Sequence, residues 1–167
     1  MSKYKKVHSG GKLLNNFGDT VKDKLEFISD FKFTFAFENS SYPGYVTEKI
    51  YDSMFVNSIP IYWGSPLINI DFNTKSFVNH HDYNNDEEVI QRIIELDQDK
   101  YKMADLLKES WFTNNKLNPY CDQETLRMFF HKIFNNQIHP VSSSLFGRYN
   151  AYKLRSKIAL SKLKKRF

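Results

Sequence analysis

Residues 32–66 read KFTFAFENSSYPGYVTEKIYDSMFVNSIPIYWGSP, and this stretch decides the fold class of the chain. Residues 32–37 alternate and then become fully apolar, which predicts a β-strand, and residues 59–63 predict a second one. Between them, residues 46–57 carry apolar side chains at helical spacing, which predicts a helix packed on a sheet. The polar cluster at residues 38–44 predicts a turn between the first strand and this helix.

Elements of the same kind lie on both sides of this stretch. Residues 24–30 predict a short helix, and residues 75–79 predict a third strand. An asparagine-capped helix is expected from residue 84 to residue 97, and two more helices at 101–108 and 124–134. Because strands alternate with helices, the sequence predicts an α/β fold with a Rossmann-like parallel sheet and flanking helices. Pro60 suits the start of a strand or an edge strand better than a central one.

Composition limits the classes of protein to consider. The chain has 167 residues, a hydrophobic share of 41% and a single cysteine, Cys121, which excludes an intrachain disulfide framework. No stretch approaches the roughly 20 apolar residues of a membrane span, and the basic amino terminus lacks the apolar run of a signal peptide. We divide the chain into a loop segment at 1–23, a Rossmann-like domain at 24–140 and a tail at 141–167.

The charge is divided unevenly along the chain. Residues 148–167 contain eight basic and no acidic side chains, so residues 1–147 carry 16 basic and 19 acidic ones. The net charge of +5 is therefore a property of the tail, and the rest of the chain is net acidic. This partition disfavours nucleic acid as a partner.

Ligand chemistry is expected at one edge of the sheet. Ligands of open parallel sheets bind beyond the carboxyl ends of the strands. Polar residues follow all three predicted strands, at 38–45, 64–66 and 80–82, so we expect these loops to converge. The central helix opens with Thr47, Glu48 and Lys49, and its first amides together with an ammonium suit a phosphate. On spacing alone, first-turn surface charges are the favoured interpretation of Glu48 and Lys49.

Three motifs in order connect this edge to a known family. Residues 35–66 contain F-x-F-E-N-S, Y-V-T-E-K and P-x-Y-W-G, and the match continues through DFNTKSFVNHHDYNNDEE at 71–88 and begins near SGGKLLNNFG at 9–18. This pattern resembles the donor-binding signature of the α-1,3/α-1,4-fucosyltransferases, glycosyltransferase family ten. About 110 residues, from 9 to roughly 115, are similar to the family's carboxyl-terminal domain.

The resemblance implies a fold and a reaction. It implies one half of a two-domain GT-B enzyme that transfers L-fucose with inversion from GDP-fucose to a hydroxyl of an N-acetylglucosamine-containing glycan. By matched motif, Lys49 contacts the donor pyrophosphate and Glu48 the fucose, and both are the expected catalytic residues. Donor-binding residues are expected to be Asn39, Ser40, Tyr45, Thr47, Glu48, Lys49, Gly64 and Ser65. No metal or other cofactor is expected, because side-chain charge and helix dipoles serve the phosphates.

Two parts of the family pattern have no counterpart in the sequence. The general base lies in the family's amino-terminal domain, and an arginine aimed at the donor phosphates precedes the match at 9–18, whereas the first arginine here is Arg92. We therefore expect that the acceptor domain is not part of this sequence and that this chain does not catalyse the transfer by itself. The alternative function is a non-catalytic nucleotide-sugar or membrane-surface binding module.

Several other features have two interpretations. His80 and His81 suggest a metal site, but neighbours on a strand point to opposite faces, so we expect loop or half-buried histidines. Trp63 is expected to be a core aromatic. Cys121 precedes a helix start, which can lower a thiol pKa, yet without a partner it is interpreted as structural or incidental.

The tail predicts a membrane-surface helix. Its apolar side chains on one helical face are Tyr149, Tyr152, Ala159, Leu160, Leu163 and Phe167. Most of its basic residues fall elsewhere, which is typical of a basic amphipathic helix on an anionic membrane. The alternative is a helix docked on the core or in a dimer. These features favour a cytoplasmic, peripheral-membrane bacterial protein, with a Golgi location as the alternative if an anchor precedes the sequence.

Overall fold

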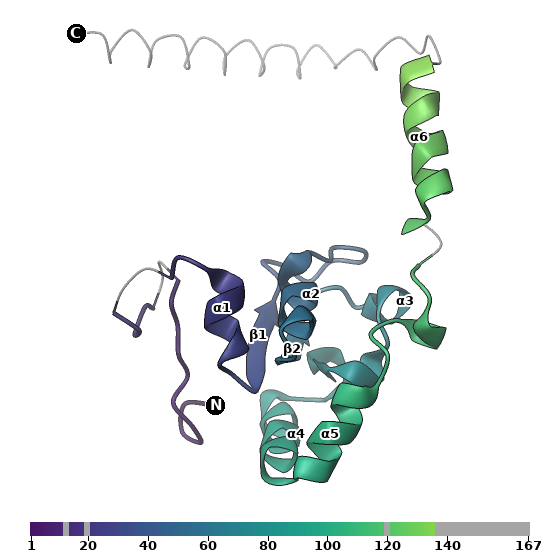
Figure 1. The fold of residues 1–167 in the computed structure, drawn as a ribbon. Coiled ribbons are helices and arrows are strands. Elements are labelled where there is room, and N and C mark those ends of the chain that lie inside the picture. Colours follow the sequence, from purple (N-terminus) through teal and green to yellow (C-terminus); the bar gives the residue numbers. More distant parts are fainter. Residues whose placement is uncertain (12–13, 19–20, 119–120, 136–167) are drawn as a thin grey trace, which may run out of the picture. The chain divides into compact units, whose positions relative to one another are not determined.

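The computed structural model of the protein describes residues 1–11, 14–18, 21–118 and 121–135 (Figure 1). The chain forms two compact units, Met1–Pro119 and Tyr120–Phe167, and each is described by itself. The predicted tail at 141–167 lies outside the described residues.

The first unit is built on a parallel sheet in the order β1-β2-β3. The strands are β1 at Phe33–Phe37, β2 at Ile59–Trp63 and β3 at Val78–Asn79. Phe33 of β1 pairs with Ile59 of β2, and the register continues to Phe37 and Trp63. The predicted α/β class with a parallel sheet is confirmed.

Helices follow the strands as the periodicity predicts. They are α1 Lys24–Ser29, α2 Glu48–Phe55, α3 Ile68–Asp71, α4 Asp86–Gln98, α5 Lys100–Lys108 and α6 Gln123–Asn135. Short 3₁₀ turns lie at Thr74–Ser76, His80–Asp82 and Thr113–Asn115. Asn85 caps α4 by accepting a hydrogen bond from the Glu88 amide, which confirms the predicted asparagine cap.

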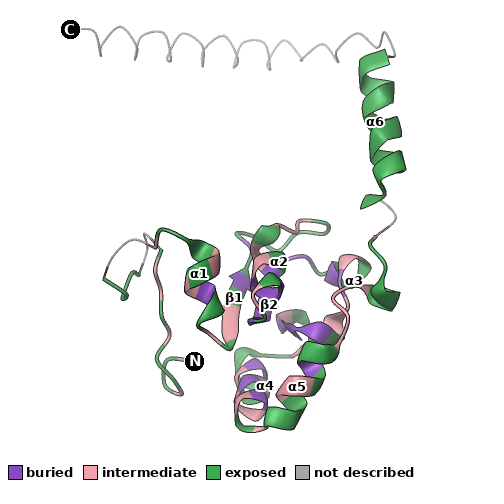
Figure 2. Ribbon diagram, in the orientation of Figure 1, coloured by how far each residue is buried: buried purple, intermediate pink, exposed green. Residues whose placement is uncertain are grey.

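Alternate residues of β1 and β2 supply two separate core clusters, because successive strand side chains point to opposite faces. On one face, Ala36 and Tyr62 pack with Ile50 and Met54 of α2. On the other face, the buried residues are Ile59, Ile61, Val78, Val89, Ile93, Leu96 and Leu106, from β2, β3, α4 and α5. Figure 2 shows the buried residues concentrated on the strands and on the inner faces of these helices.

The third strand is shorter than the predicted 75–79. Only Val78 and Asn79 pair with β2, and residues 74–76 form a 3₁₀ turn instead. The Asn73 side chain accepts a hydrogen bond from the Lys75 amide at 3.2 Å, and the Ser76 hydroxyl donates to the Asn73 carbonyl at 2.7 Å. These local bonds compete with strand pairing, which explains the difference.

Pro60 is the second residue of the central strand, so of its two expected places the edge strand is wrong and a position near the strand start is confirmed. The Ile59 amide donates to the Lys32 carbonyl on the β1 side, so the next residue faces the β3 side. Pairing with β3 begins only at Ile61. The missing amide hydrogen of Pro60 therefore faces a part of β2 that β3 does not reach, and no ladder bond is lost.

The α4 side of β1 is only partly covered. Phe35 and Phe37 each have an exposed fraction of 42%, and Trp63 is half-buried with its ring tilted against that of Phe37. The expectation that Trp63 is a core aromatic is therefore wrong, because α4 covers β2 and β3 but leaves this end open. These three rings line a cleft of about 500 Å³ together with residues of α4.

Among the described residues, α6 is the only helix of the second unit. None of its side chains is buried, as Figure 2 shows. Its exposed apolar residues are Leu126, Met128, Phe129, Phe130, Ile133 and Phe134. No helix in the described ranges combines the length and the apolar character needed to cross a membrane.

Candidate functional site

The loops that follow the three strands meet at the carboxyl edge of the sheet, as predicted. The Ser41 hydroxyl, after β1, donates to the Gly64 carbonyl, after β2, at 2.8 Å. His81, after β3, lies with its Nε2 atom 2.9 Å from the same carbonyl oxygen. The Gly44 amide donates to the Ser65 hydroxyl at 3.0 Å. One glycine carbonyl and one serine hydroxyl thus join three loops that are distant in sequence.

Glu38 organises the start of helix α2. Its side chain has an exposed fraction of 0%. The carboxylate accepts hydrogen bonds from the Thr47 amide at 2.8 Å and from the Thr47 hydroxyl at 2.8 and 3.0 Å. Thr47 is the N-cap residue of α2, but its hydroxyl caps none of the helix amides, because it is turned towards Glu38. The first-turn amides of α2 therefore have no side-chain acceptor from their own cap residue.

Lys49 lies in the first turn of α2 and points back towards the loop after β1. Its ammonium donates to the Glu38 carboxylate at 3.2 Å and to the Asn39 side-chain oxygen at 3.2 Å. An ammonium has three donor hydrogens, so these two bonds leave one for a ligand. The side chain is 26% exposed, which leaves it accessible from solvent.

Glu48 differs from Lys49 in its surroundings. Its side chain is 66% exposed, and its carboxylate lies 4.0 Å from the Lys24 ammonium of α1. Lys24 makes a closer pair with Asp52, at 2.7 Å. Glu48 is thus only weakly paired and is available to a positively charged or hydroxyl-bearing ligand.

The remaining predicted donor-binding residues fall into two groups. Asn39 and Ser40 are exposed in the loop, and Tyr45 and Thr47 are half-buried beside the α2 start. Gly64 and Ser65, in contrast, are buried. The Ser65 hydroxyl accepts hydrogen bonds from the Gly44 and Leu67 amides, so it braces the loops in this structure.

Gly64 provides space for Glu38. A Cβ atom on Gly64 would lie 2.5 Å from Cγ of Glu38 and 2.5 Å from the Tyr62 hydroxyl. That hydroxyl accepts a hydrogen bond from the Ser65 amide at 2.8 Å, and burial raises the pKa of Tyr62. The absence of a side chain at residue 64 therefore leaves room for both the Glu38 side chain and the Tyr62 hydroxyl.

The two histidines are not on a strand. They lie in the 3₁₀ turn His80–Asp82, so the assumption of a strand geometry for them is wrong. The Asn79 side chain caps this turn, which ends β3 after two residues. His80 pairs through Nε2 with Asp86 at 2.8 Å, while His81 contacts Gly64. Each ring is thereby directed to a different partner. In the described ranges, no group of three or more histidine, cysteine or acidic side chains could hold a metal ion.

Sequence reasoning missed Glu38 as an organising residue. The sequence places Glu38 only within the polar loop after the first strand, because its role depends on Thr47 and Lys49, nine and eleven residues later. One signal was available: an acidic side chain directly follows an apolar strand. A charge at that point is either exposed by a turn or buried with partners, and only the structure decides between them.

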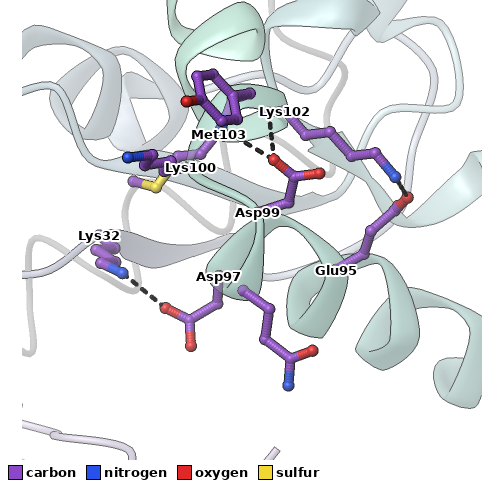
Figure 3. Close-up of a pocket in the computed structure, with 9 residues that line it drawn as sticks. Lys32, Glu95, Asp97, Asp99, Lys100, Lys102 and Met103 are labelled. Atoms are coloured by element: carbon purple, nitrogen blue, oxygen red, sulfur yellow. Dashed lines mark hydrogen bonds and ion pairs between the residues drawn. The ribbon is translucent and has the colours of Figure 1, made fainter.

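A second hollow, of about 520 Å³, lies at the turn between α4 and α5, and Figure 3 shows the side chains that line it. Four of its charged groups pair with each other: Lys32 with Asp97 at 2.9 Å, and Lys102 with Glu95. Asp99 accepts hydrogen bonds from the first amides of α5. Lys32 precedes β1, so this hollow lies at the amino end of that strand, where ligands of parallel sheets do not bind.

The parallel sheet with flanking helices defines an α/β domain of the Rossmann type, and its loops converge on the start of α2. The sequence model described as glycosyltransferase family 10 (fucosyltransferase), carboxyl-terminal domain, matches residues 1–135. The chain therefore belongs to glycosyltransferase family 10.

Individual relatives agree with this assignment. The chain is 50% identical over 104 residues to the α-(1,3)-fucosyltransferase FucT of Helicobacter pylori, covering 62% of this chain and 22% of the relative. It is 30% identical over 151 residues to the putative fucosyltransferase R654 of Acanthamoeba polyphaga mimivirus, covering 82% of this chain and 25% of the relative. The chain thus spans about a quarter of the length of these curated relatives.

Solved structures show the same likeness. A crystal structure of an α1,3-fucosyltransferase with GDP-fucose superimposes with a TM-score of 0.77 at 40% identity, covering 83% of this chain and 42% of the other. A second such structure, with GDP, gives a TM-score of 0.77 at 41% identity, covering 81% and 41%. The predicted family is confirmed.

Proposed function

We propose that this chain is the donor-binding part of a fucosyltransferase and binds GDP-fucose at the start of helix α2. The observation that carries the proposal is the Lys49 ammonium, which shares the Glu38 carboxylate with the Thr47 amide at the start of α2 and retains a donor hydrogen. The Thr47 side chain caps none of the first-turn amides of this helix. A diphosphate matches both features, because a helix start and an ammonium each favour negative charge.

The proposed reaction is the transfer of L-fucose to a hydroxyl of an N-acetylglucosamine-containing glycan with inversion. The acceptor oxygen forms a bond to C1 of fucose while the bond from C1 to the β-phosphate oxygen breaks, and the hydroxyl proton passes to a general base. Negative charge grows on the leaving GDP, where Lys49 and the α2 amides stabilise it. Positive charge grows on the sugar ring, where the exposed Glu48 carboxylate is suited to stabilise it, by analogy with glycoside hydrolysis.

Adjacent residues of one helix start can serve both charges. Glu48 and Lys49 are separated by about 100° around α2, so their side chains diverge from one point. In the structure they have different partners, Lys24 for Glu48 and Glu38 with Asn39 for Lys49. This arrangement supports distinct roles for the two predicted catalytic residues. None of these groups is a metal ligand in the proposal.

Calorimetry with GDP tests the donor site. We expect the unaltered chain to bind GDP and Lys49→Ala to lose a charge-assisted contact of about 1.5–3 kcal/mol, or roughly 10- to 150-fold in affinity. The matched control is Lys108→Ala, since Lys108 lies on α5 in an exposed pair with Asp105. Unchanged GDP binding by the Lys49 variant would show that the site is assigned to the wrong residues.

A transfer assay separates binding from turnover. We propose that this chain binds the donor without transferring fucose by itself, because none of the residues assigned here acts as the general base. The assay supplies GDP-fucose and an N-acetylglucosamine-containing acceptor and measures fucosylated product. Product formation by the chain alone would overturn the proposal of binding without turnover. It would not contradict the proposed donor site.

A further inference from the structure

We infer that Glu38 is a positioning residue for the proposed donor site, a role that rests on the proposed function. Its carboxylate holds the Lys49 ammonium and the Thr47 hydroxyl at once. Both groups belong to the start of α2. Glu38 itself is fully buried and has no access to a ligand, so it acts through the residues it contacts.

A buried carboxylate at residue 38 is costly to the fold. Removing an ionised carboxylate from water costs several kcal/mol unless partners compensate for it, and an apolar residue of similar size is commonly as stable or more stable at such a place. Packing therefore does not account for an acid at residue 38. Glu38 accepts hydrogen bonds from an amide, a hydroxyl and an ammonium. All three donors belong to the start of α2, where the anion site is proposed.

Glu38 also affects how the start of α2 is capped. A threonine at an N-cap normally turns its hydroxyl to the amide two or three residues later, which here would be that of Lys49 or Ile50. The Thr47 hydroxyl instead donates to Glu38, and in this orientation its oxygen accepts no hydrogen bond from those amides. The amides are left to a phosphate oxygen instead of to the protein's own side chain.

Glu38 also restricts the position of the Lys49 ammonium. A free lysine side chain has many rotamers, and fixing it when a ligand binds costs entropy. Glu38 and Asn39 fix two of the three ammonium donors before any ligand arrives. Gly64 completes the arrangement, because only a residue without Cβ leaves room for the Glu38 side chain.

Calorimetry with GDP on a double-mutant cycle tests this inference. Glu38→Gln keeps the size of the side chain but removes its charge, and we expect GDP affinity to fall about tenfold. In a chain that already carries Lys49→Met, the same change should weaken binding only about two- to threefold, because its main partner is gone. A merely structural role would give the same fold-change in both backgrounds.

The control is a second buried carboxylate. Asp97 has an exposed fraction of 6% and binds Lys5 and Lys32 at the amino end of β1. Asp97→Asn should change the stability of the protein and leave GDP affinity within about twofold of the unaltered chain. Should Glu38→Gln fail to fold, Glu38→Asp keeps the charge but shortens the reach by one methylene, and we again expect weaker GDP binding.

The outcomes separate the two proposals. Absence of GDP binding by the unaltered chain overturns the proposed donor site, and this inference with it. GDP binding that depends on Lys49 but is unchanged or strengthened in the Glu38 variants overturns the inference alone. If Glu38→Gln weakens GDP binding equally in the unaltered chain and in the Lys49→Met chain, the inference alone is also overturned.

Discussion

Asp97 shows at the scale of one residue how the described amino-terminal segment is attached to the sheet unit. Its carboxylate accepts hydrogen bonds from the Lys5 ammonium, from Lys32 at 2.9 Å and from the Tyr4 hydroxyl at 2.9 Å. The hydrogen bonds from Lys5 and then from Lys32 are the largest causes that hold the pKa of Asp97 far below its usual range. Three segments distant in sequence thus depend on one ionised carboxylate.

This carboxylate should make stability depend on pH. Because the folded-state pKa is lowered, the stabilisation is present above the unfolded pKa of about 3.9 and is lost as the pH falls towards the folded value. We expect Asp97→Asn to lower the free energy of unfolding at pH 7 by about 1 kcal/mol, since both lysines are solvent-exposed. Urea unfolding at pH 7 and at about pH 3 measures both the loss and its pH dependence.

The control for this measurement is Asp105→Asn. Asp105 forms an exposed pair with Lys108, and its loss should change stability by less than about 0.5 kcal/mol. An Asp97 variant that unfolds at the same urea concentration as the unaltered chain at pH 7 would contradict the role assigned to this residue.

At the scale of an element, the end of β2 determines whether the site can form. Gly64 follows the last residue of the strand and lies against Glu38 and Tyr62. We expect Gly64→Ala to destabilise the protein by roughly 1–3 kcal/mol, because a buried methyl group forces both neighbours to move. GDP binding should weaken as well, since the displaced Glu38 side chain holds Lys49.

Pro66→Ala is the matched change in the same loop. The Pro66 side chain is exposed, so this variant should alter stability by less than about 1 kcal/mol. Thermal unfolding and GDP calorimetry of the two variants provide the comparison. Equal stability of Gly64→Ala and the unaltered chain would show that the loop relaxes at no cost and that the close approach is unimportant.

The same elements show how far sequence patterns reach. The boundaries of β2 and the cap of α4 were predicted correctly because apolar alternation and an asparagine cap are local properties. The length of β3 was overestimated because side chains at Asn73 and Asn79 form turns on both sides of it. Its short length also makes room for Pro60 in the central strand, a consequence that spans two strands.

At the scale of the whole molecule, the partition of charge leads to a prediction about membranes. The chain carries a net charge of +5, and residues 148–167 alone contribute eight basic side chains. These residues lie outside the described part of the structure, so the membrane-surface proposal rests on sequence. We expect the chain to sediment with vesicles that contain anionic lipid and to be released as the salt concentration rises.

A chain ending at Gly147 is the control for this prediction. It keeps the α6 helix with its exposed apolar side chains but loses the basic residues that follow. Its binding to the same vesicles should be much weaker. Equal sedimentation of both chains would assign membrane binding to another part of the molecule, and absence of sedimentation for both would refute the proposal.

The sequence by itself determined the α/β class, the parallel strands and the family, because apolar periodicity and the motifs between Phe35 and Pro66 are contiguous in the chain. It also predicted that the loops after the three strands meet, since parallel strands end at one edge. Only the tertiary structure decided that Glu38 is buried, that Ser65 braces loops and that Trp63 is half-exposed. Those properties depend on which distant groups come within hydrogen-bonding or packing distance, and that information is not local in the sequence.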